Sequence, residues 1–424
     1  MLQSSFIDRP SAHKEGDDMA TAQNLPLKGV TALELGHTVM GPVCGLILAD
    51  MGAEVFKVER TGKGDDTRWL KGFGSGFFTY FNRNKKSISL DLKSEKGKEV
   101  LLKLVEEVDV LIENFGPGTV EKLGVGYDVC SKINPKLIYC SLKGFMPGPY
   151  QNRPALDEVV QMMGGLAYMT GPTGRPLRAG SSVTDIMGGS YGAIGILSAL
   201  YERQITGRGK LVQAALYESV AFMVGQHMAV AAVSGEFPAP MPERGRTWSI
   251  YDLFTSADNE QVFVGVTSET HWQRMCDTFG FSDWAQDKRL ASNQGRIDAR
   301  EWFLPELQKR FAALTKNELM AMSERAEIPF SPVNKPIDLV DDAHLNESGS
   351  LADVKTPGGG HAKLPKIPLR VDGSTFDLHS HPPEIGEGSL EMYRRIGYTG
   401  YQIETFLKEG VVQISEQKQS LHFV

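Results

Sequence analysis

One acid in this chain has a residue type and neighbours that could support nucleophilic chemistry. Residues 179–210 read AGSSVTDIMGGSYGAIGILSALYERQITGRGK, with Asp185 directly after Ser181, Ser182 and Thr184. Serine and threonine favour the start of a helix, so Asp185 should lie at or just inside a helix N-terminus. Free backbone N–H groups and the positive end of the helix dipole stabilise an anion there. A simpler alternative, in which Asp185 is only a capping residue, is open at this point.

The expected helix after Asp185 carries a stripe of small residues. Gly188, Gly192, Gly195 and Ala199 recur at intervals of four, three and four residues. An interior glycine costs a helix up to about 1 kcal/mol relative to alanine, so the stripe predicts another backbone pressed against it. The remaining surface predicts a buried helix, because it carries Ile186, Ile194, Ile196, Leu197, Leu200 and Tyr201.

Bulk composition restricts the class of protein. With 424 residues the chain is expected to form two or more domains. A formal net charge of −7 argues against nucleic acid or an anionic membrane as the main partner. The sequence has no run of 18 uninterrupted apolar residues, so no membrane span is expected. It also has no cluster of histidine and cysteine at the spacing of metal ligands, so no metal site is expected. Four cysteines without a CxxC spacing fit a reducing cytoplasm.

The N-terminal residues 1–24 are polar and lack the apolar core of a signal peptide, so we expect a disordered tail there. From Leu27 onward, apolar strand-like runs alternate with helical patterns. The strand-like runs are residues 27–36, 54–60, 86–92, 110–115 and 136–145, and helical patterns occupy 41–53, 94–109 and 117–133. This alternation predicts an α/β fold with a parallel, doubly wound sheet.

Ligands of such sheets gather at the carboxyl ends of the strands. Here those ends carry chemically capable residues: residues 36–39 (Gly-His-Thr-Val), Glu59 with Arg60, Asn114, and Lys143. One alternative is a dinucleotide-binding oxidoreductase with Glu59 on a ribose. The first turn reads GHTVMG, however, and lacks the GxGxxG pattern that lets a backbone approach a pyrophosphate, so we rank a nicotinamide dehydrogenase low.

The rest of the chain predicts a second, smaller domain. Residues 211–232 form an apolar helical pattern, and a proline-rich linker follows at 236–247. A strand pair with Asn259 at its turn and several tryptophan-containing helices then indicate an α+β unit. A terminal helix is expected around residues 403–408.

The order and spacing of these segments resemble the class III CoA-transferases, a family that includes formyl-CoA transferase and carnitine CoA-transferase. The matching segments extend from about Leu27 to Tyr398 and include LADMGAEVFKVER, GDDTR, NRNKKSISLDLK, LIENFGPG, GFMPG, TGRGK, IPFSPV and IGY. The resemblance implies a Rossmann-like large domain, a smaller α+β domain and an interlaced, ring-like homodimer. It places residues 25–225 and 341–424 in the large domain, with a linker at 226–245 and the small domain at 246–340.

The resemblance also implies a mechanism, because the family's catalytic aspartate falls on Asp185. That carboxylate would attack a donor acyl-CoA, form an acyl anhydride and then an aspartyl-CoA thioester, and pass CoA to a second acid. Asp157 matches a second acid near the site. The alternative, in which Asp157 only caps a helix at the surface, stays open. No cofactor is expected to be tightly bound, since CoA and acyl-CoA act as substrates.

Further residues match the CoA-binding positions of the family. Arg60 matches a residue near the nucleotide end of CoA, where a basic side chain suits the 3′-phosphate. The other matching positions are Val39, Leu90, Lys93, Asn114 and Lys143.

Two departures from formyl-CoA transferase bear on the second substrate. Val39, close to His37, replaces a glutamine, and the segment PERGRTW replaces a run of glycines. Arg244 and Arg246 in that segment could bind a second carboxylate, which favours a small dicarboxylate acceptor such as succinate, malate or mesaconate over oxalate.

Two other functions stay open. A 2-methylacyl-CoA racemase shares the fold but needs a histidine and an acid, and here Leu156 precedes Asp157 where that family carries histidine. A non-catalytic CoA-binding protein is the alternative from another class, although such a scaffold would not require Asp185.

Overall fold

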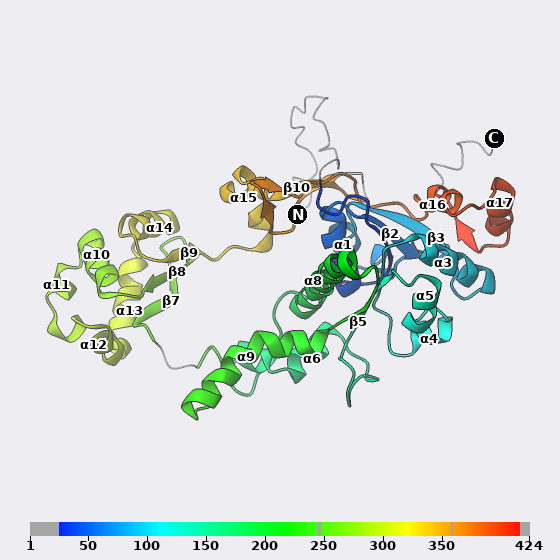
Figure 1. The fold of residues 1–424 in the computed structure, drawn as a ribbon. Helices are drawn as coiled ribbons and strands as arrows, with labels where there is room; N and C mark the ends of the chain where they lie inside the picture. Colours follow the sequence, from blue (N-terminus) through cyan, green and yellow to red (C-terminus); the bar gives the residue numbers. More distant parts are fainter. Residues whose placement is uncertain (1–24, 244–246, 358, 416–424) are drawn as a thin grey trace. The chain divides into compact units, whose positions relative to one another are not determined.

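The computed structural model describes residues 25–243, 247–357 and 359–415. These residues divide into two compact units (Figure 1). The larger unit comprises the described residues up to 242 together with those from 344 onward, and the smaller unit comprises the described part of 243–343. The chain therefore leaves the larger unit once and returns to it.

A seven-stranded sheet organises the larger unit. Its strands are β1 (Thr31–Leu35), β2 (Glu54–Glu59), β3 (Lys85–Leu90), β4 (Val110–Glu113), β5 (Ile138–Lys143), β6 (Leu211–Ala215) and β14 (Val412–Gln413). The order is β14-β3-β2-β1-β4-β5-β6, and all neighbours are parallel except β14, which is antiparallel to β3. This arrangement confirms the predicted α/β class with a mainly parallel sheet. The strand order reverses between β1 and β4, and α/β sheets bind ligands outside such a switch point.

Both faces of the sheet are covered, because successive side chains of a strand point to opposite faces. Ala32 and Val110 belong to a core beneath α1 (Met40–Asp50), α6 (Asp157–Met163), α8 (Val183–Thr206) and α9 (Leu216–Ser234). Leu33 and Leu111 belong to a second core beneath α3 (Glu95–Glu107), α5 (Tyr127–Ile133), α16 (Ser389–Arg395) and α17 (Gly400–Lys408). Figure 1 shows the two helix layers on either side of the sheet. Shorter helices of this unit are α2 (Phe77–Phe81), α4 (Thr119–Leu123), α7 (Leu166–Thr170) and α15 (Ala343–Glu347), the last at the boundary.

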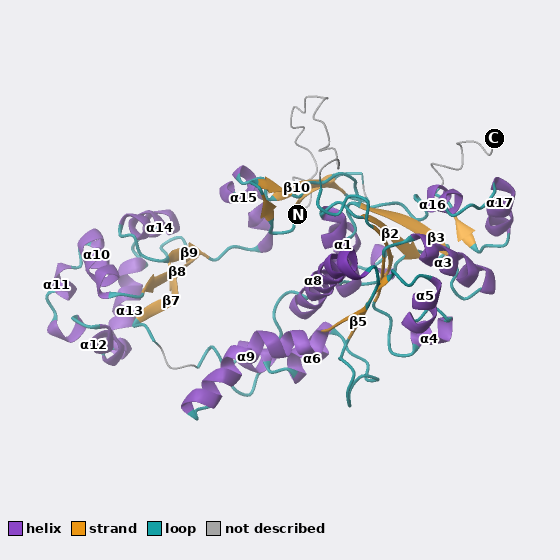
Figure 2. Cartoon of the chain, viewed as in Figure 1, coloured by secondary structure: helices purple, strands orange, loops and turns teal. Residues whose placement is uncertain are grey.

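The smaller unit combines an antiparallel sheet with helices (Figure 2). Its strands are β7 (Ile250–Thr255), β8 (Gln261–Val266) and β9 (Phe330–Pro332). Its helices are α10 (Glu269–Phe279), α11 (Ser282–Ala285), α12 (Asn293–Asp298), α13 (Arg300–Phe311) and α14 (Lys316–Arg325). Asn259 lies at the β7–β8 turn with φ of 60°, a left-handed conformation that asparagine tolerates. Two short antiparallel pairs, β10 (Leu351–Lys355) with β11 (His361–Pro365) and β12 (Arg370–Val371) with β13 (Ser374–Thr375), lie in the larger unit.

Two predicted helices were wrong in detail. The pattern at 211–232 is not one helix, because residues 211–215 form strand β6, which pairs with β5, and α9 begins only at Leu216. That helix continues to Ser234, so the first part of the predicted linker is helical. The pattern at 117–133 is divided into α4 and α5 because Gly124 ends α4 in a left-handed conformation.

The packing of α8 also differs from the prediction. The backbone that approaches α8 does so at Gly189, where an added Cβ would lie 2.5 Å from the Met40 carbonyl oxygen. Within the predicted stripe, Gly192 instead meets the Leu142 side chain, at 2.7 Å from an added Cβ. The helix is only partly buried within one chain, since Tyr201 is 74% exposed.

Helices α8 and α9 are each long and apolar enough to cross a membrane, by length and composition only. Neither helix is an uninterrupted run of 18 apolar residues, because α8 contains Asp185 and α9 contains Glu218, so the prediction that no segment spans a membrane stays a prediction. Core helices of water-soluble proteins meet the same criterion, and α8 contributes to the core beneath the sheet.

Candidate active site

Asp185 is the third residue of α8, as expected for an acid just inside a helix N-terminus. The predicted serine or threonine cap is absent, because the N-cap residue Ser182 makes no side-chain capping hydrogen bond. Asp157 takes this role from 28 residues upstream. One oxygen of its carboxylate accepts hydrogen bonds from the Thr184 backbone N–H at 2.8 Å and the Thr184 hydroxyl at 2.5 Å, with the Asp185 N–H at 3.4 Å.

Asp157 is itself buried, at the first position of α6. Its second carboxylate oxygen accepts a hydrogen bond of 2.6 Å from the Gln161 side chain and lies 3.7 Å from the Arg178 guanidinium. Arg178 also pairs with Glu158. The alternative of a surface helix cap is wrong, because this carboxylate is buried and caps α8.

The two carboxylates form a pair with distinct surroundings. Burial, and next the neighbouring Asp157 charge, raise the pKa of Asp185 to about 7, although Arg178 opposes both effects. Desolvation and a like charge both disfavour the ionised form of a carboxylate. Asp185 is therefore a basic carboxylate that titrates near neutral pH.

A second group of predicted residues lies at the switch point of the sheet. Asn114, after β4, accepts a 2.9 Å hydrogen bond from the His37 backbone N–H and donates one of 2.9 Å to the His37 carbonyl. Lys143, at the end of β5, donates to Glu113 at 2.6 Å and to the Phe115 carbonyl at 2.9 Å. His37, Asn114 and Lys143 thus gather at the carboxyl ends of β1, β4 and β5.

The turn between β1 and α1 is unusually compact. Thr38 has φ of 66°, which is strained for a β-branched residue, and its hydroxyl lies 2.9 Å from His37 Nδ1. Burial lowers the pKa of His37. A Cβ added to Gly41 would lie 2.8 Å from the Gly36 Cα, so only glycine lets α1 begin this close to the strand. Strained backbone of this kind persists where surrounding contacts enforce it, often at functional sites.

The remaining predicted residues differ in what their side chains do. Val39 and Leu90 are buried in hydrophobic cores, so a ligand would meet them mainly through the backbone. Val39 shares its core with Ile186, the residue after Asp185, which connects the β1–α1 turn to the α8 terminus. Lys93 is exposed, and the exposed Arg60 pairs with Asp66. Arg244 and Arg246 lie outside the described residues.

Comparison with known proteins shows which family the chain belongs to. The sequence model described as CoA-transferase family III matches residues 27–389, which is most of the chain. The chain belongs to CoA-transferase family III.

Individual relatives agree with this assignment. A formyl-CoA:oxalate CoA-transferase of Bradyrhizobium sp. (strain ORS 278) is 32% identical over 413 residues, covering 91% of this chain and 97% of the relative. An acyl-CoA transferase of Fusarium pseudograminearum is also 32% identical, covering 93% of this chain and 90% of the relative. A solved CaiB/BaiF family protein from Brucella suis has a TM-score of 0.80 and 31% identity, covering 88% of this chain and all of that one. The protein is thus an enzyme of the CoA-transferase type.

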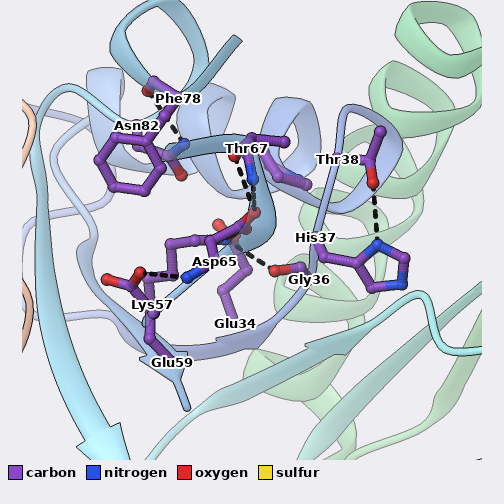
Figure 3. Close-up of polar contacts among 12 residues, drawn as sticks. Glu34, Gly36, His37, Thr38, Lys57, Glu59, Asp65, Thr67, Phe78 and Asn82 are labelled. Atoms are coloured by element: carbon purple, nitrogen blue, oxygen red, sulfur yellow. Dashed lines mark hydrogen bonds and ion pairs between the residues drawn. The ribbon is translucent and has the colours of Figure 1, made fainter. Parts of the chain in front are cut away.

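Sequence reasoning missed several residues of this candidate site. Arg178 and Gln161, which contact Asp157, lie in segments without a local signal for a shared site. A buried cluster of charges also lies beside the β1–α1 turn and consists of Glu34, Lys57 and Asp65, which Figure 3 labels, and Lys85. The sequence feature that could have indicated this cluster is a charged residue inside an otherwise apolar strand, such as Glu34 in the segment TALEL. Glu59, considered for a ribose, is bound to Arg68 at 2.7 Å and to Ser87 at 2.6 Å.

Proposed function

We propose that the enzyme transfers CoA from an acyl-CoA donor to a small carboxylic acid, with Asp185 as the nucleophile. The observation that carries this proposal is the half-buried Asp185 carboxylate at the N-terminus of α8, beside the Asp157 carboxylate. A raised pKa makes the ionised form of Asp185 a stronger nucleophile than an ordinary carboxylate.

Each step of the proposed reaction exchanges one bond for another. An Asp185 oxygen attacks the thioester carbonyl carbon, the C–S bond breaks, and the CoA thiolate leaves with the electron pair. The thiolate attacks the Asp185 carbonyl carbon of the resulting anhydride and releases the donor acid as its carboxylate. An acceptor carboxylate then attacks the aspartyl-CoA thioester, and the released thiolate takes the acceptor acyl group and frees Asp185.

The surroundings of Asp185 suit such a sequence. The α8 N-terminus presents backbone N–H groups and a positive dipole, which favour the negative charge that develops on oxygen. Burial limits water, which would hydrolyse an anhydride. Asp157 would hold the terminus of α8 in place and raise the basicity of Asp185.

We propose that CoA binds along the carboxyl ends of the strands. Arg60 would meet the 3′-phosphate. His37, Asn114 and Lys143 lie at the switch point, where α/β sheets bind ligands. Val39 and Leu90 would contribute backbone groups, and Lys93 would add charge at the N-terminal end of α3.

A trapping experiment tests the reaction. Purified protein is incubated with succinyl-CoA, treated with hydroxylamine or borohydride, and digested for mass spectrometry. We expect a modification on the peptide containing Asp185, and none in Asp185→Ala. Absence of any adduct, combined with exchange of the α-hydrogen of a methylacyl-CoA, would identify a racemase instead.

The acceptor is proposed to be a small dicarboxylate of four or five carbons. Relatives named formyl-CoA:oxalate CoA-transferase use a dicarboxylate by name, which supports a site for two carboxylates. Replacing Arg244 and Arg246 by alanine should raise the KM for the acceptor roughly tenfold, with the donor KM unchanged, because one charged contact is lost. Steady-state kinetics with each substrate varied would measure this, and an unchanged acceptor KM removes the role.

We further propose that the enzyme is a homodimer in the cytoplasm. Apolar side chains stand exposed on the outer surfaces of α8 and α9 within one chain, which supports burial against a second copy. All four cysteines are free, which fits a reducing compartment.

A further inference from the structure

A cluster of four buried charged residues lies behind the β1–α1 turn: Glu34, Lys57 and Asp65, which Figure 3 labels, and Lys85. The side chains are at most 2% exposed, and they come from β1, β2, β3 and the loop after β2. Two positive and two negative charges give the cluster no net charge. None of these residues has been assigned a role in the proposed reaction.

Both ammonium groups contact several buried acceptors. Lys57 contacts Glu34 at 3.1 Å, the Gly36 carbonyl at 2.7 Å and Asp65 at 2.8 Å. Lys85 contacts Glu34 at 2.6 Å, the Pro42 carbonyl at 2.8 Å and the Asn82 side chain at 3.0 Å. An ammonium has three N–H donors, so three hydrogen bonds use every donor of Lys85. Two hydrogen bonds and the ion pair with Asp65 restrain the orientation of Lys57.

The two lysines thereby hold both ends of the β1–α1 turn. Lys57 fixes the Gly36 carbonyl at its start, and Lys85 fixes the Pro42 carbonyl in the first turn of α1, just beyond its end. Glu34 joins the two lysines. The residues between these contacts include His37 and Val39.

Asp65 extends the cluster to a second loop. Its other carboxylate oxygen accepts hydrogen bonds from the Thr67 backbone N–H at 2.8 Å and the Thr67 hydroxyl at 2.7 Å. Its own N–H donates to Glu59 at 2.8 Å. Although burial by itself would raise it, Lys57 and Thr67 hold the pKa of Asp65 at about 2, so this carboxylate stays charged. Asp65 thus shapes the loop that begins at Arg60.

Stability alone does not account for such a cluster. Replacing a buried ion pair by packed apolar residues is often neutral or stabilising, because burying charges is costly. Apolar residues could not replace the lysine in one respect, however. Only a group with several N–H donors can contact the β1–α1 turn and the loop after β2 at the same time.

We propose that Lys57 is a positioning residue, which sets the β1–α1 turn through Gly36 and the Arg60 loop through Asp65. The two loops are those that would hold opposite parts of CoA, so this role rests on the proposed function. Lys57 itself touches no substrate and acts through Gly36 and Asp65.

The test compares equilibrium binding of CoA and 3′-dephospho-CoA by calorimetry, which requires no turnover. Asp65→Asn is the main variant, because it retains the size of the side chain and an oxygen for Thr67 while its amide faces the Lys57 ammonium. The wild-type protein should prefer CoA by roughly tenfold or more through Arg60, and Asp65→Asn should remove most of this preference. Lys57→Met should do the same, and the double variant should lose no more than either single variant.

Asp50→Asn is the matched control. Asp50 is a buried carboxylate in α1 that pairs with Arg83 at 2.7 Å and contacts no member of the cluster. This variant should lower the Tm while keeping the preference for the 3′-phosphate. If Lys57→Met does not fold, Asp65→Asn still decides the question.

The outcomes separate this inference from the proposed function. Wild-type protein that binds no CoA would overturn both. Two results would overturn the positioning role and leave the CoA-transferase function standing. One is a wild-type protein that binds CoA and 3′-dephospho-CoA equally well. The other is an Asp65→Asn protein that retains the full preference for CoA. Loss of the preference in Asp65→Asn and Lys57→Met, with Asp50→Asn unchanged, supports the positioning role.

Discussion

Asp185 and Asp157 show how two identical functional groups acquire different properties from their surroundings. Asp157 accepts four hydrogen bonds, from Thr184, Asp185 and Gln161, which hold its side chain at the start of α8. Asp185 is half-buried beside that carboxylate, and its pKa rises to about 7. The pair therefore divides the work between a charged group that organises the helix terminus and a basic group available for reaction.

The raised pKa predicts an acid limb in the activity. Because the ionised form of Asp185 is the proposed nucleophile, kcat/KM should fall about tenfold per pH unit below about pH 7. Asp157→Asn removes the like charge, so its acid limb should move to lower pH, although its overall rate falls. Initial rates from pH 5 to 9 measure both, and a wild-type limb near pH 4 would contradict the raised pKa.

The same shift predicts a pH-dependent stability. Between its ordinary pKa of 3.8 and about 7, Asp185 binds more protons in the folded than in the unfolded chain, so the free energy of unfolding falls as pH rises. Asparagine does not ionise, so Asp185→Asn removes this decrease in the free energy of unfolding. At 1.36 kcal/mol for each pKa unit, the variant should be more stable than the wild type at pH 8 by at most about 4 kcal/mol.

The gain from Asp185→Asn should disappear as the pH falls toward 4, where the wild-type carboxyl is protonated when folded. Urea unfolding of both proteins at pH 4 and pH 8 measures this. An equal difference at the two pH values would show that the asparagine acts through packing and not through charge.

At the scale of elements, α1 is packed closely against β1 and α8 through its smallest residues. Gly41 touches Gly36, and the Met40 carbonyl approaches Gly189. Gly45 leaves room for the Glu34 carboxylate, since an added Cβ would lie 1.9 Å from its oxygen. The glycines of α1 thus create the space in which the buried charges meet.

Gly45→Ala should accordingly be destabilising. The new methyl group displaces Glu34 from Lys57 or Lys85, so the free energy of unfolding should fall by about 2 kcal/mol or more. Gly400→Ala is the control, because Gly400 begins α17 and nothing lies within 4 Å of an added Cβ. That variant should be neutral or up to about 1 kcal/mol more stable. Thermal unfolding of both variants tests this prediction. Equal Tm values for Gly45→Ala and Gly400→Ala would contradict the close contact between position 45 and Glu34.

At the scale of the whole molecule, the large unit has an incompletely covered helix layer. Exposed apolar side chains on α8 and α9 include Ile194, Tyr201, Ile205, Phe222, Met228 and Val233. Several exposed large apolar side chains on two neighbouring helices are costly in water, which supports an interaction surface. A second copy of the chain is the occupant that the proposed homodimer requires.

A single charge should therefore weaken the proposed dimer. Phe222, on α9, is 71% exposed within one chain, and Phe222→Asp should shift the mass in multi-angle light scattering toward the monomer, because burying an unpaired carboxylate is costly. Tyr401→Asp on α17, where the tyrosine is 81% exposed, is the matched control and should leave the mass unchanged. A monomeric wild-type protein would contradict the proposed homodimer.

Much of the architecture was predictable from local sequence. Apolar runs alternating with helical patterns indicated the parallel sheet, and the strand ends indicated where a ligand would lie. The errors occurred where a local pattern was ambiguous. Residues 211–215 continue the apolar pattern of α9, but pairing with β5 makes them a strand. Neither helical periodicity nor propensity contains that information.

The sequence by itself determined the family, the α/β class and the position of Asp185 inside a helix terminus. Its order of motifs and its run of small polar residues before an apolar helix were sufficient for these conclusions. Only the tertiary structure decided that Asp157 caps α8, that Asp185 is basic, and that Lys57 joins two loops. The physical reason is that desolvation and charge pairing depend on which distant segments meet, and spacing along the chain does not encode these contacts.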